Sequence, residues 1–166
     1  MSENELDLNA EKLSLSAIRY FDMKQNRVSN YKFNFNEMLK FDGDTALYLI
    51  YEYARVCSII EKSGFSSEYI HQFIQSGWKL THPAEHELVV HLIKFGDIVD
   101  YVAENLTLNY LCKFMYDASS KFATAYNNYK VIEPEFAATR ILVIELFRKI
   151  LEKCFFLLGM ETMEKI

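Results

Sequence analysis

The sequence predicts an all-α protein, a bundle of helices preceded by an N-terminal helix and an extended arm. Only five glycines and two prolines occur in 166 residues, so few residues interrupt helices. Apolar residues recur every three or four positions over several long segments, which is the period of an amphipathic helix. Because the composition is 51% hydrophobic and 15% aromatic, a single domain with an appended segment has enough apolar side chains for a sizeable core.

The N-terminal part contains two kinds of pattern. Apolar residues repeat at helical spacing over residues 9–23, at Leu13, Ala17, Ile18 and Phe21. The stretch "YKFNFNEML" then alternates Tyr31, Phe33 and Phe35 with polar residues, the period of a strand or of an extended segment. We therefore divide the chain into a helix with an extended arm, 1–42, and a helical domain, 43–166.

The helical domain begins after the turn "FDGD". Asp44 is a suitable N-cap for a long helix over 45–62, and Gly64 ends it. A shorter helix follows in "SEYIHQFIQ", capped by Ser66 or Ser67 and ended by Gly77. The later helices are predicted over 83–95, from Gly96 to about residue 106, over 108–129, and over 136–158 with Gly159 at its end.

Charge and cysteines restrict the function and the compartment. The net charge is −5, which argues against a general binder of nucleic-acid backbones but leaves room for a local basic face. Cys57, Cys112 and Cys154 are odd in number and far apart, so they predict a reducing compartment. The polar, acidic N-terminus resembles no signal region, and no apolar run approaches the ~20 residues of a membrane span. We expect a cytoplasmic protein without a membrane partner.

The stretch "THPAEHELVVHLIKF" has two interpretations. His82, Glu85 and His86 match the H-x-x-E-H pattern of inverted zinc proteases, and His91 lies within reach as a third ligand. The other interpretation is an ordinary helix start, with Pro83 at the first helical position.

A second set of residues is aromatic. Tyr48 and Tyr51 lie near the start of one long helix, followed by Arg55. Tyr126 and Tyr129 lie near the end of another, beside Asn127, Asn128 and Lys130. Rings, amides and cations together suit unstacked bases. Composition alone favours amphipathic core tyrosines with solvated hydroxyl groups. No glycine-rich phosphate loop and no G-x-S-x-G motif occurs, and nothing in the chain is self-evidently catalytic.

Motifs that follow one another along the chain resemble motifs of the arginyl-tRNA synthetase family. Residues 20–27 resemble its "Y-x-D-L-x-x-N-R" stretch, and residues 43–55, "GDTALYLIYEYAR", resemble "G-N-T-x-x-Y-L-x-Y-x-x-x-R" with Asp44 in place of the usual Asn. Residues 111–132 resemble "L-C-x-Y-L-Y-x-L-x-x-x-F-x-x-F-Y". The closing residues 140–166 resemble the family's last helix, so the likeness covers nearly the whole chain.

The resemblance implies the anticodon-binding helical bundle of class I aminoacyl-tRNA synthetases, with the short connection from the catalytic domain. Its expected partners are arginine tRNA and the catalytic domain of the same protein, and we expect a monomer. The catalytic H-I-G-H and K-M-S-K motifs do not occur in these 166 residues. We therefore expect no cofactor in this chain and no activity of the chain alone, whereas the parent arginine–tRNA ligase uses ATP with Mg.

The resemblance also implies site residues. Asn26 and Arg27 are expected at the tRNA body or at the domain junction. The residues expected to contact the anticodon are Tyr48, Tyr51, Arg55, Tyr126, Tyr129, Lys130 and Ile166. The histidines near residue 82 match no metal ligands of the family, so we favour the helix start and predict no metal site. The alternative function is a helical protein-interaction module in a synthetase complex.

Overall fold

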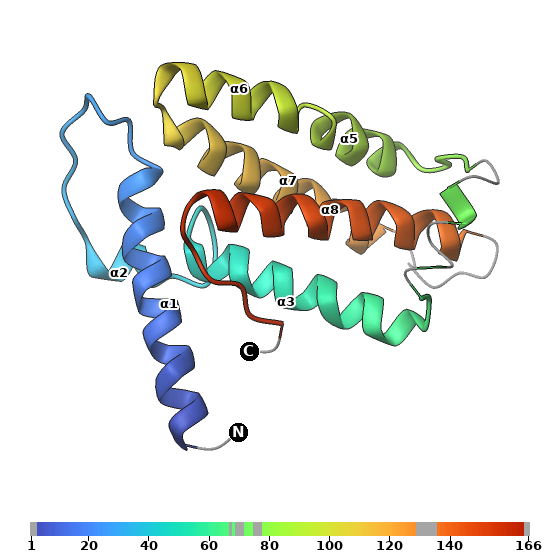
Figure 1. Cartoon of the computed structure of the whole chain (residues 1–166), viewed down its shortest axis with the longest axis horizontal. Helices are drawn as coiled ribbons and strands as arrows, with labels where there is room; N and C mark the ends of the chain where they lie inside the picture. The colour runs from blue at the N-terminus through green and yellow to red at the C-terminus, as the bar shows by residue number, and fades with distance from the viewer. Residues whose placement is uncertain (1–2, 67, 69–71, 75–77, 129–135, 165–166) are drawn as a thin grey trace.

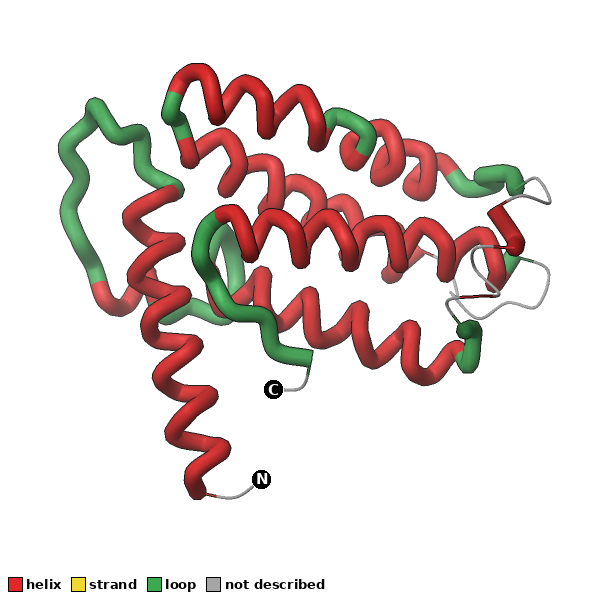
Figure 2. Tube along the Cα trace, viewed as in Figure 1, coloured by secondary structure: helices red, strands yellow, loops and turns green. Residues whose placement is uncertain are grey.

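The computed structural model describes residues 3–66, 68, 72–74, 78–128 and 136–164. These residues form helices and loops without a strand (Figure 2), which confirms the predicted all-α class. The helices are α1 (Glu3–Met23), α2 (Phe35–Met38), α3 (Ala46–Ser63), α5 (Pro83–Leu92), α6 (Phe95–Asn105), α7 (Leu108–Asn128) and α8 (Ala137–Leu157). Residues 68 and 72–74 are also helical, whereas Ser67, Gly77 and most of the predicted short helix lie outside the described residues.

The helices of the bundle lie side by side. Figure 1 shows α3 and α7 running in one direction, with α8 and the nearly continuous α5 and α6 running the opposite way. Helix α1 crosses one end of this bundle. The core contains fully buried side chains from α1, α3, α5, α7 and α8, among them Tyr20, Leu49, Leu88, Phe122, Phe147 and Phe155. In the described part of the chain, none of the helices combines the length and the apolar character that crossing a bilayer requires.

Caps determine where the helices begin and end. The N-cap of α3 is Thr45, whose hydroxyl accepts the backbone N–H of Tyr48 at 3.2 Å. The prediction of Asp44 as this cap is wrong, because the Asp44 carboxylate is used in a contact with α1. Gly64 ends α3 with φ of 70°, as predicted. Helix α8 ends at Leu157 with Leu158 as its C-cap, and Gly159 follows with φ of 63°, a conformation that glycine adopts without strain.

The arm after α1 is only partly extended. Residues 30–34 have no regular structure, but Phe35 begins the short helix α2, so the prediction of an extended segment is wrong from Phe35 onward. The cause is Asn34, whose side chain accepts the backbone N–H of Asn36 at 2.9 Å and caps the helix. Phe33 packs edge-on against Phe21 of α1 at 5.3 Å, which holds the arm against that helix.

Helix α1 is joined to the bundle by polar contacts at a buried position. The Tyr20 hydroxyl lies 2.6 Å from the Asp44 carboxylate and 3.1 Å from the carbonyl oxygen of Cys112. Lys24 donates to the carbonyl oxygen of Asp44 at 2.6 Å. Since Tyr20 is also part of the common hydrophobic core, α1 packs with the bundle, and the division of the chain at residues 42 and 43 stays a prediction.

The C-terminal tail returns to α1. The Arg19 guanidinium donates to the carbonyl oxygen of Gly159. Lys12 and Glu161 form an ion pair with a separation of 2.9 Å between Nζ and the carboxylate oxygen. The first and last described segments therefore contact each other beside the bundle (Figure 1).

Candidate nucleic-acid interface

Helices α3 and α7 bring together residues that are distant in the sequence. The rings of Tyr48 and Tyr116 meet edge-on with centroids 5.9 Å apart. Further along both helices, the Arg55 guanidinium carbon lies 4.1 Å from the centroid of the Tyr126 ring. We call these four residues and Tyr51 the α3–α7 row. Three of the predicted site residues, Tyr48, Arg55 and Tyr126, are thus in one row of contacts between two helices that run in the same direction.

The spacing along α3 explains how this helix contributes three residues. Tyr48, Tyr51 and Arg55 are separated by three and then four positions, so their side chains are neighbours on the helix surface. Tyr51 is 50% exposed and offers a ring to solvent. Tyr48 is partly buried, and burial, followed by the nearby Glu52 carboxylate, raises the pKa of Tyr48 to about 12. Its hydroxyl group is therefore protonated at neutral pH and can donate a hydrogen bond.

Arg55 is held by a carboxylate as well as by a ring. Its Nη1 donates to Oε1 of Glu52 at 3.3 Å. Glu52 is only 3% exposed, and burial raises the pKa of its carboxyl group, with the Arg55 charge acting against that rise. The guanidinium is thus placed between an aromatic face and a buried acid, a position that combines cation–π attraction with a charge-assisted hydrogen bond.

The other predicted residues are not part of this row or lie outside the described residues. Tyr129, Lys130 and Ile166 lie outside the described residues. Asn26 belongs to the turn after α1, where its side-chain oxygen accepts the backbone N–H of Val28 at 3.1 Å. Arg27 is exposed in the same turn.

The stretch predicted to be either a zinc motif or a helix start is a helix start. His82 is the N-cap of α5, and Pro83 is its first residue. Glu85 is fully buried, accepts the backbone N–H groups of Thr81 and His82 at 2.9 and 3.2 Å, and pairs with Arg140 at 3.1 Å. Its carboxylate is thus occupied by a capping box and a buried ion pair, which leaves no proton-transfer role for it.

The other two histidines of this stretch, His86 and His91, lie in different surroundings. The Nε2 atom of His91 lies 3.0 Å from the carbonyl oxygen of Phe114, and the two rings stack at 4.6 Å. His86 is exposed on α5. Within the described ranges, no group of three histidine, cysteine or acidic side chains has an arrangement that could hold a metal ion.

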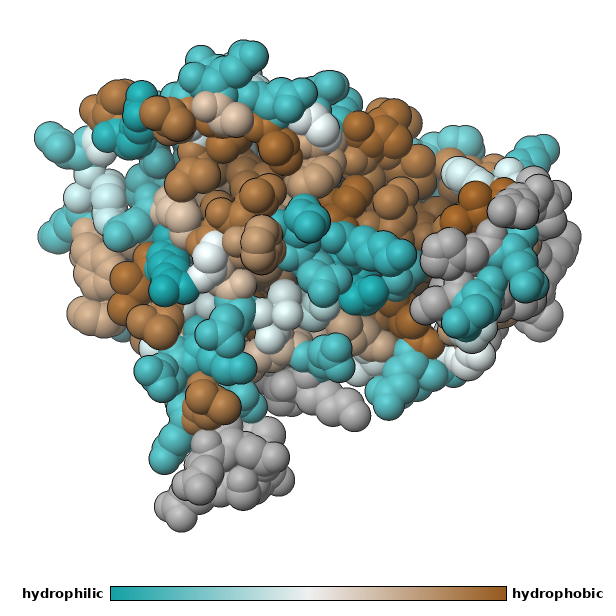
Figure 3. Space-filling view, in the orientation of Figure 1, coloured by the Kyte–Doolittle hydropathy of each residue, from teal (hydrophilic) through white to brown (hydrophobic). Residues whose placement is uncertain are grey.

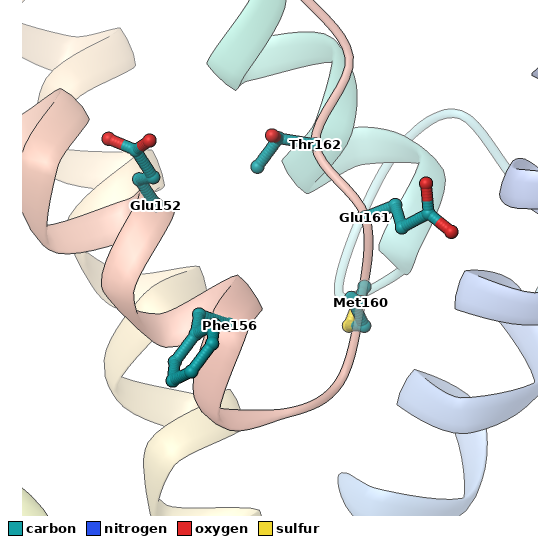
Figure 4. Close-up of a pocket in the computed structure, with 5 residues that line it drawn as sticks. All are labelled: Glu152, Phe156, Met160, Glu161 and Thr162. Carbon is teal, nitrogen blue, oxygen red and sulfur yellow. The ribbon is translucent and has the colours of Figure 1, made fainter.

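A cleft of about 300 Å³ lies elsewhere, between α8 and the C-terminal tail. Figure 4 shows Phe156 and Glu152 on α8 opposite Met160, Glu161 and Thr162 on the tail. Two carboxylates at this opening disfavour a phosphate group. The α3–α7 row, which contains a cation and several rings, has the more suitable chemistry for a nucleic acid.

Sequence reasoning missed two members of this region, Glu52 and Tyr116. Glu52 is four residues after Tyr48 and three before Arg55, so helical spacing alone places it beside both. Tyr116 carries no comparable signal, because its contact with Tyr48 depends on how two remote helices pack.

Comparison with known proteins agrees with this architecture. Residues 49–166 match the family model described as the DALR anticodon binding domain. The chain is 39% identical to the cytoplasmic arginine–tRNA ligase of Arabidopsis thaliana, over 99% of this chain and 28% of the relative. It is 38% identical to the arginine–tRNA ligase of Alteromonas mediterranea, over 100% of this chain and 29% of the relative. The chain thus spans less than a third of the length of these curated relatives.

Solved structures show the same fold. The arginyl-tRNA synthetase of Plasmodium falciparum superposes with a TM-score of 0.88 at 38% identity, over 96% of this chain and 28% of that one. The Thermus thermophilus enzyme superposes with a TM-score of 0.80 at 25% identity, over 95% of this chain and 27% of that one. Since the family model extends over more than half of the residues and includes α7 and α8 entirely, this chain belongs to the DALR anticodon binding domain family.

Proposed function

We propose that this chain is the anticodon-binding part of an arginine–tRNA ligase, and that the α3–α7 row contacts the anticodon loop. The observation that carries the proposal is the Arg55 guanidinium over the Tyr126 ring at 4.1 Å, in line with the exposed Tyr51 and with Tyr48. Aromatic and guanidinium faces stack on unpaired bases, and each stacked base contributes about 1–3 kcal/mol of binding free energy. The parent enzyme uses ATP with Mg in its catalytic portion and attaches arginine to its tRNA.

Specificity and affinity are expected to come from different parts of the parent. With a net charge of −5, this chain neutralises few phosphates, so its own tRNA binding is weak and salt-sensitive. The catalytic portion supplies the further contacts to the tRNA body. The full ligase therefore binds tRNA much more tightly than this chain does, and equal affinities would contradict this division of labour.

The test is a binding titration at low salt with arginine tRNA and with the same tRNA changed at its central anticodon base. The wild-type chain is expected to prefer the unchanged anticodon, and Tyr51→Ala and Tyr126→Ala are expected to reduce that preference. Tyr110→Ala is the matched control, because Tyr110 is also a partly exposed tyrosine of α7 but lies 16 residues, roughly 24 Å of helix, before Tyr126. Equal binding of both tRNAs by the wild type would assign anticodon reading to another part of the ligase.

The arm provides the surface proposed for the catalytic portion. Six of its large apolar side chains are at least 40% exposed: Val28, Tyr31, Phe33, Phe35, Leu39 and Phe41. Figure 3 shows apolar residues at the edge of the molecule where the arm and α2 lie. Exposed apolar clusters mark interaction sites, and Asn26 and Arg27 are in the turn that begins this arm.

This arm surface also separates the proposed function from its alternative, a protein-interaction module in a synthetase complex. Phe41→Ser is expected to lower the thermal stability of the full ligase while leaving that of the isolated chain unchanged, because the surface is covered only in the ligase. If the chain is instead a protein-interaction module, the same substitution is expected to weaken its binding to a different protein and to leave the thermal stability of the ligase unchanged.

A further inference from the structure

Glu52 is a buried acid with an incomplete set of hydrogen bonds. Its side chain is 3% exposed, and Oε1 accepts the Nη1 of Arg55 at 3.3 Å. Among the described residues, Oε2 has no hydrogen-bond partner. A carboxylate in such a position is costly to bury, and replacing it with an apolar side chain is often neutral or stabilising. Stability therefore does not explain why this position holds an acid. The explanation that remains is the contact of the Glu52 carboxylate with Arg55.

That contact determines where the Arg55 guanidinium lies. Arginine has a long, flexible side chain, and holding it in one place requires more than one anchor. Glu52 is one anchor and the Tyr126 ring, 4.1 Å from the guanidinium carbon, is the other. The Tyr126 ring has Phe122 at 6.0 Å and Arg55 over one face. A base that approaches this face meets the guanidinium before it meets the ring.

We propose that Glu52 is a positioning residue that holds the Arg55 guanidinium over Tyr126, so that the outer side of the guanidinium, and not the ring itself, is the stacking platform for an anticodon base. The order of the stack is then Tyr126, Arg55, base. This inference rests on the proposed function for the identity of the ligand, whereas the positioning of Arg55 by Glu52 is a property of the free chain.

The positioning is measured without RNA. The Nε–Hε resonance of Arg55 in the free wild-type chain is expected to show a ring-current shift from Tyr126, and the Arg55→Lys spectrum assigns it by its loss. Glu52→Met is expected to move this resonance to the position of a solvated arginine while the amide spectrum of the bundle is retained. An unchanged resonance in Glu52→Met would overturn the proposal whether or not tRNA binds.

The platform is measured with arginine tRNA in a double-mutant cycle. Arg55→Ala is expected to weaken binding at least about fivefold, the lower end of what a stacked base contributes. Glu52→Met is expected to weaken it at least about twofold, the smallest coupling usual between residues in contact. In the Arg55→Ala background, Glu52→Met is expected to have no further effect, because there is no guanidinium left to position.

Controls separate this role from charge and from folding. Glu61→Met also removes one negative charge, from an exposed position of α3. Its affinity for tRNA shows how much of the effect of Glu52→Met comes from weaker charge repulsion alone. Tyr126→Phe keeps the ring under Arg55 and is expected to retain wild-type affinity. Equal losses from Glu52→Met in both backgrounds would indicate a structural role and overturn the proposal. A wild-type chain that binds no tRNA would contradict the proposed function and with it the platform, and the resonance of the free chain would then decide the positioning alone.

Discussion

Glu85 and Arg140 form an ion pair inside the bundle, with 3.1 Å between Oε1 and Nε and with side chains that are 0% and 5% exposed. The pair joins the start of α5 to the start of α8. Arg140 also lies over the Phe136 ring at 5.0 Å. The same Glu85 caps α5, so one carboxylate serves both the local structure of a helix and its packing.

Removing this carboxylate is expected to destabilise the protein. Glu85→Ala removes a buried carboxylate that pairs with the Arg140 guanidinium, and breaking a buried pair typically costs about 3–5 kcal/mol of unfolding free energy. Urea denaturation followed by circular dichroism measures the loss. Glu87→Ala is the control, since the Glu87 side chain is 68% exposed and an exposed pair contributes less than about 1 kcal/mol. Equal losses in the two variants would show that burial of the pair is not what matters.

Asp44 is expected to anchor α1 to the bundle. Asp44→Ala removes the acceptor of the Tyr20 hydroxyl, which lies 2.6 Å away in the core, and a hydrogen bond to a charged group contributes about 1.5–3 kcal/mol. Tyr20→Phe is expected to lower the unfolding free energy less, because it removes the hydroxyl donor but leaves the ring packed. Amide hydrogen exchange measures the anchoring. Relative to the wild type, Asp44→Ala is expected to accelerate exchange in α1 more than in α8. Uniform acceleration throughout the bundle would contradict a local anchor.

The stability contribution of Glu52 is expected to depend on pH. Burial raises the pKa of Glu52 in the folded protein above its ordinary value of 4.5. The folded state therefore binds this proton more readily than the unfolded state does, and the contribution of the group to stability is lost as pH rises through the folded pKa. The difference in unfolding free energy between Glu52→Gln and the wild type should shift in favour of the variant from pH 4 to pH 7.5. A constant difference, measured by urea denaturation at both pH values, would contradict the shift.

The thiols are expected to be unreactive in the folded protein. Burial raises the pKa of the Cys112 thiol to about 12 and that of the Cys154 thiol still further, and both are fully buried. Because the thiolate is the reactive form, a disulfide reagent at pH 8 should modify neither in the native state and all three cysteines after denaturation. Cys57, which is partly exposed and whose pKa is also raised by burial, should react slowly. In the Cys112→Ser variant the remaining thiols are those of Cys57 and Cys154. Rapid modification of both in the native state would contradict the burial of Cys154.

The helices could be predicted from the sequence because their signals are local. The apolar period of 45–62, Gly64 after it and Pro83 at the start of α5 each act within a few residues. Asp44 failed as a cap for a non-local reason: its carboxylate accepts a bond from Tyr20, 24 residues earlier, and the adjacent Thr45 caps the helix instead. The prediction of an extended segment is wrong from Phe35 onward because Asn34 caps a helix there, and this local cap outweighs the alternating pattern.

The candidate site could be predicted only in part. Tyr48, Tyr51 and Arg55 share a helix, so their proximity follows from their spacing. That Arg55 lies over Tyr126, 71 residues later in the chain, depends on the packing of α3 beside α7, which no local pattern encodes. Tyr116 was missed for the same reason.

The contacts of Arg19 with Gly159 and of Lys12 with Glu161 have a mechanical consequence. A pull on α1 reaches the tail directly, across two contacts, and does not have to pass through the 140 positions of chain that separate Arg19 from Gly159. Force applied to α1 and to the C-terminal tail is therefore borne first by the Arg19 and Lys12 contacts, and these two contacts have to break before α1 and the tail can separate.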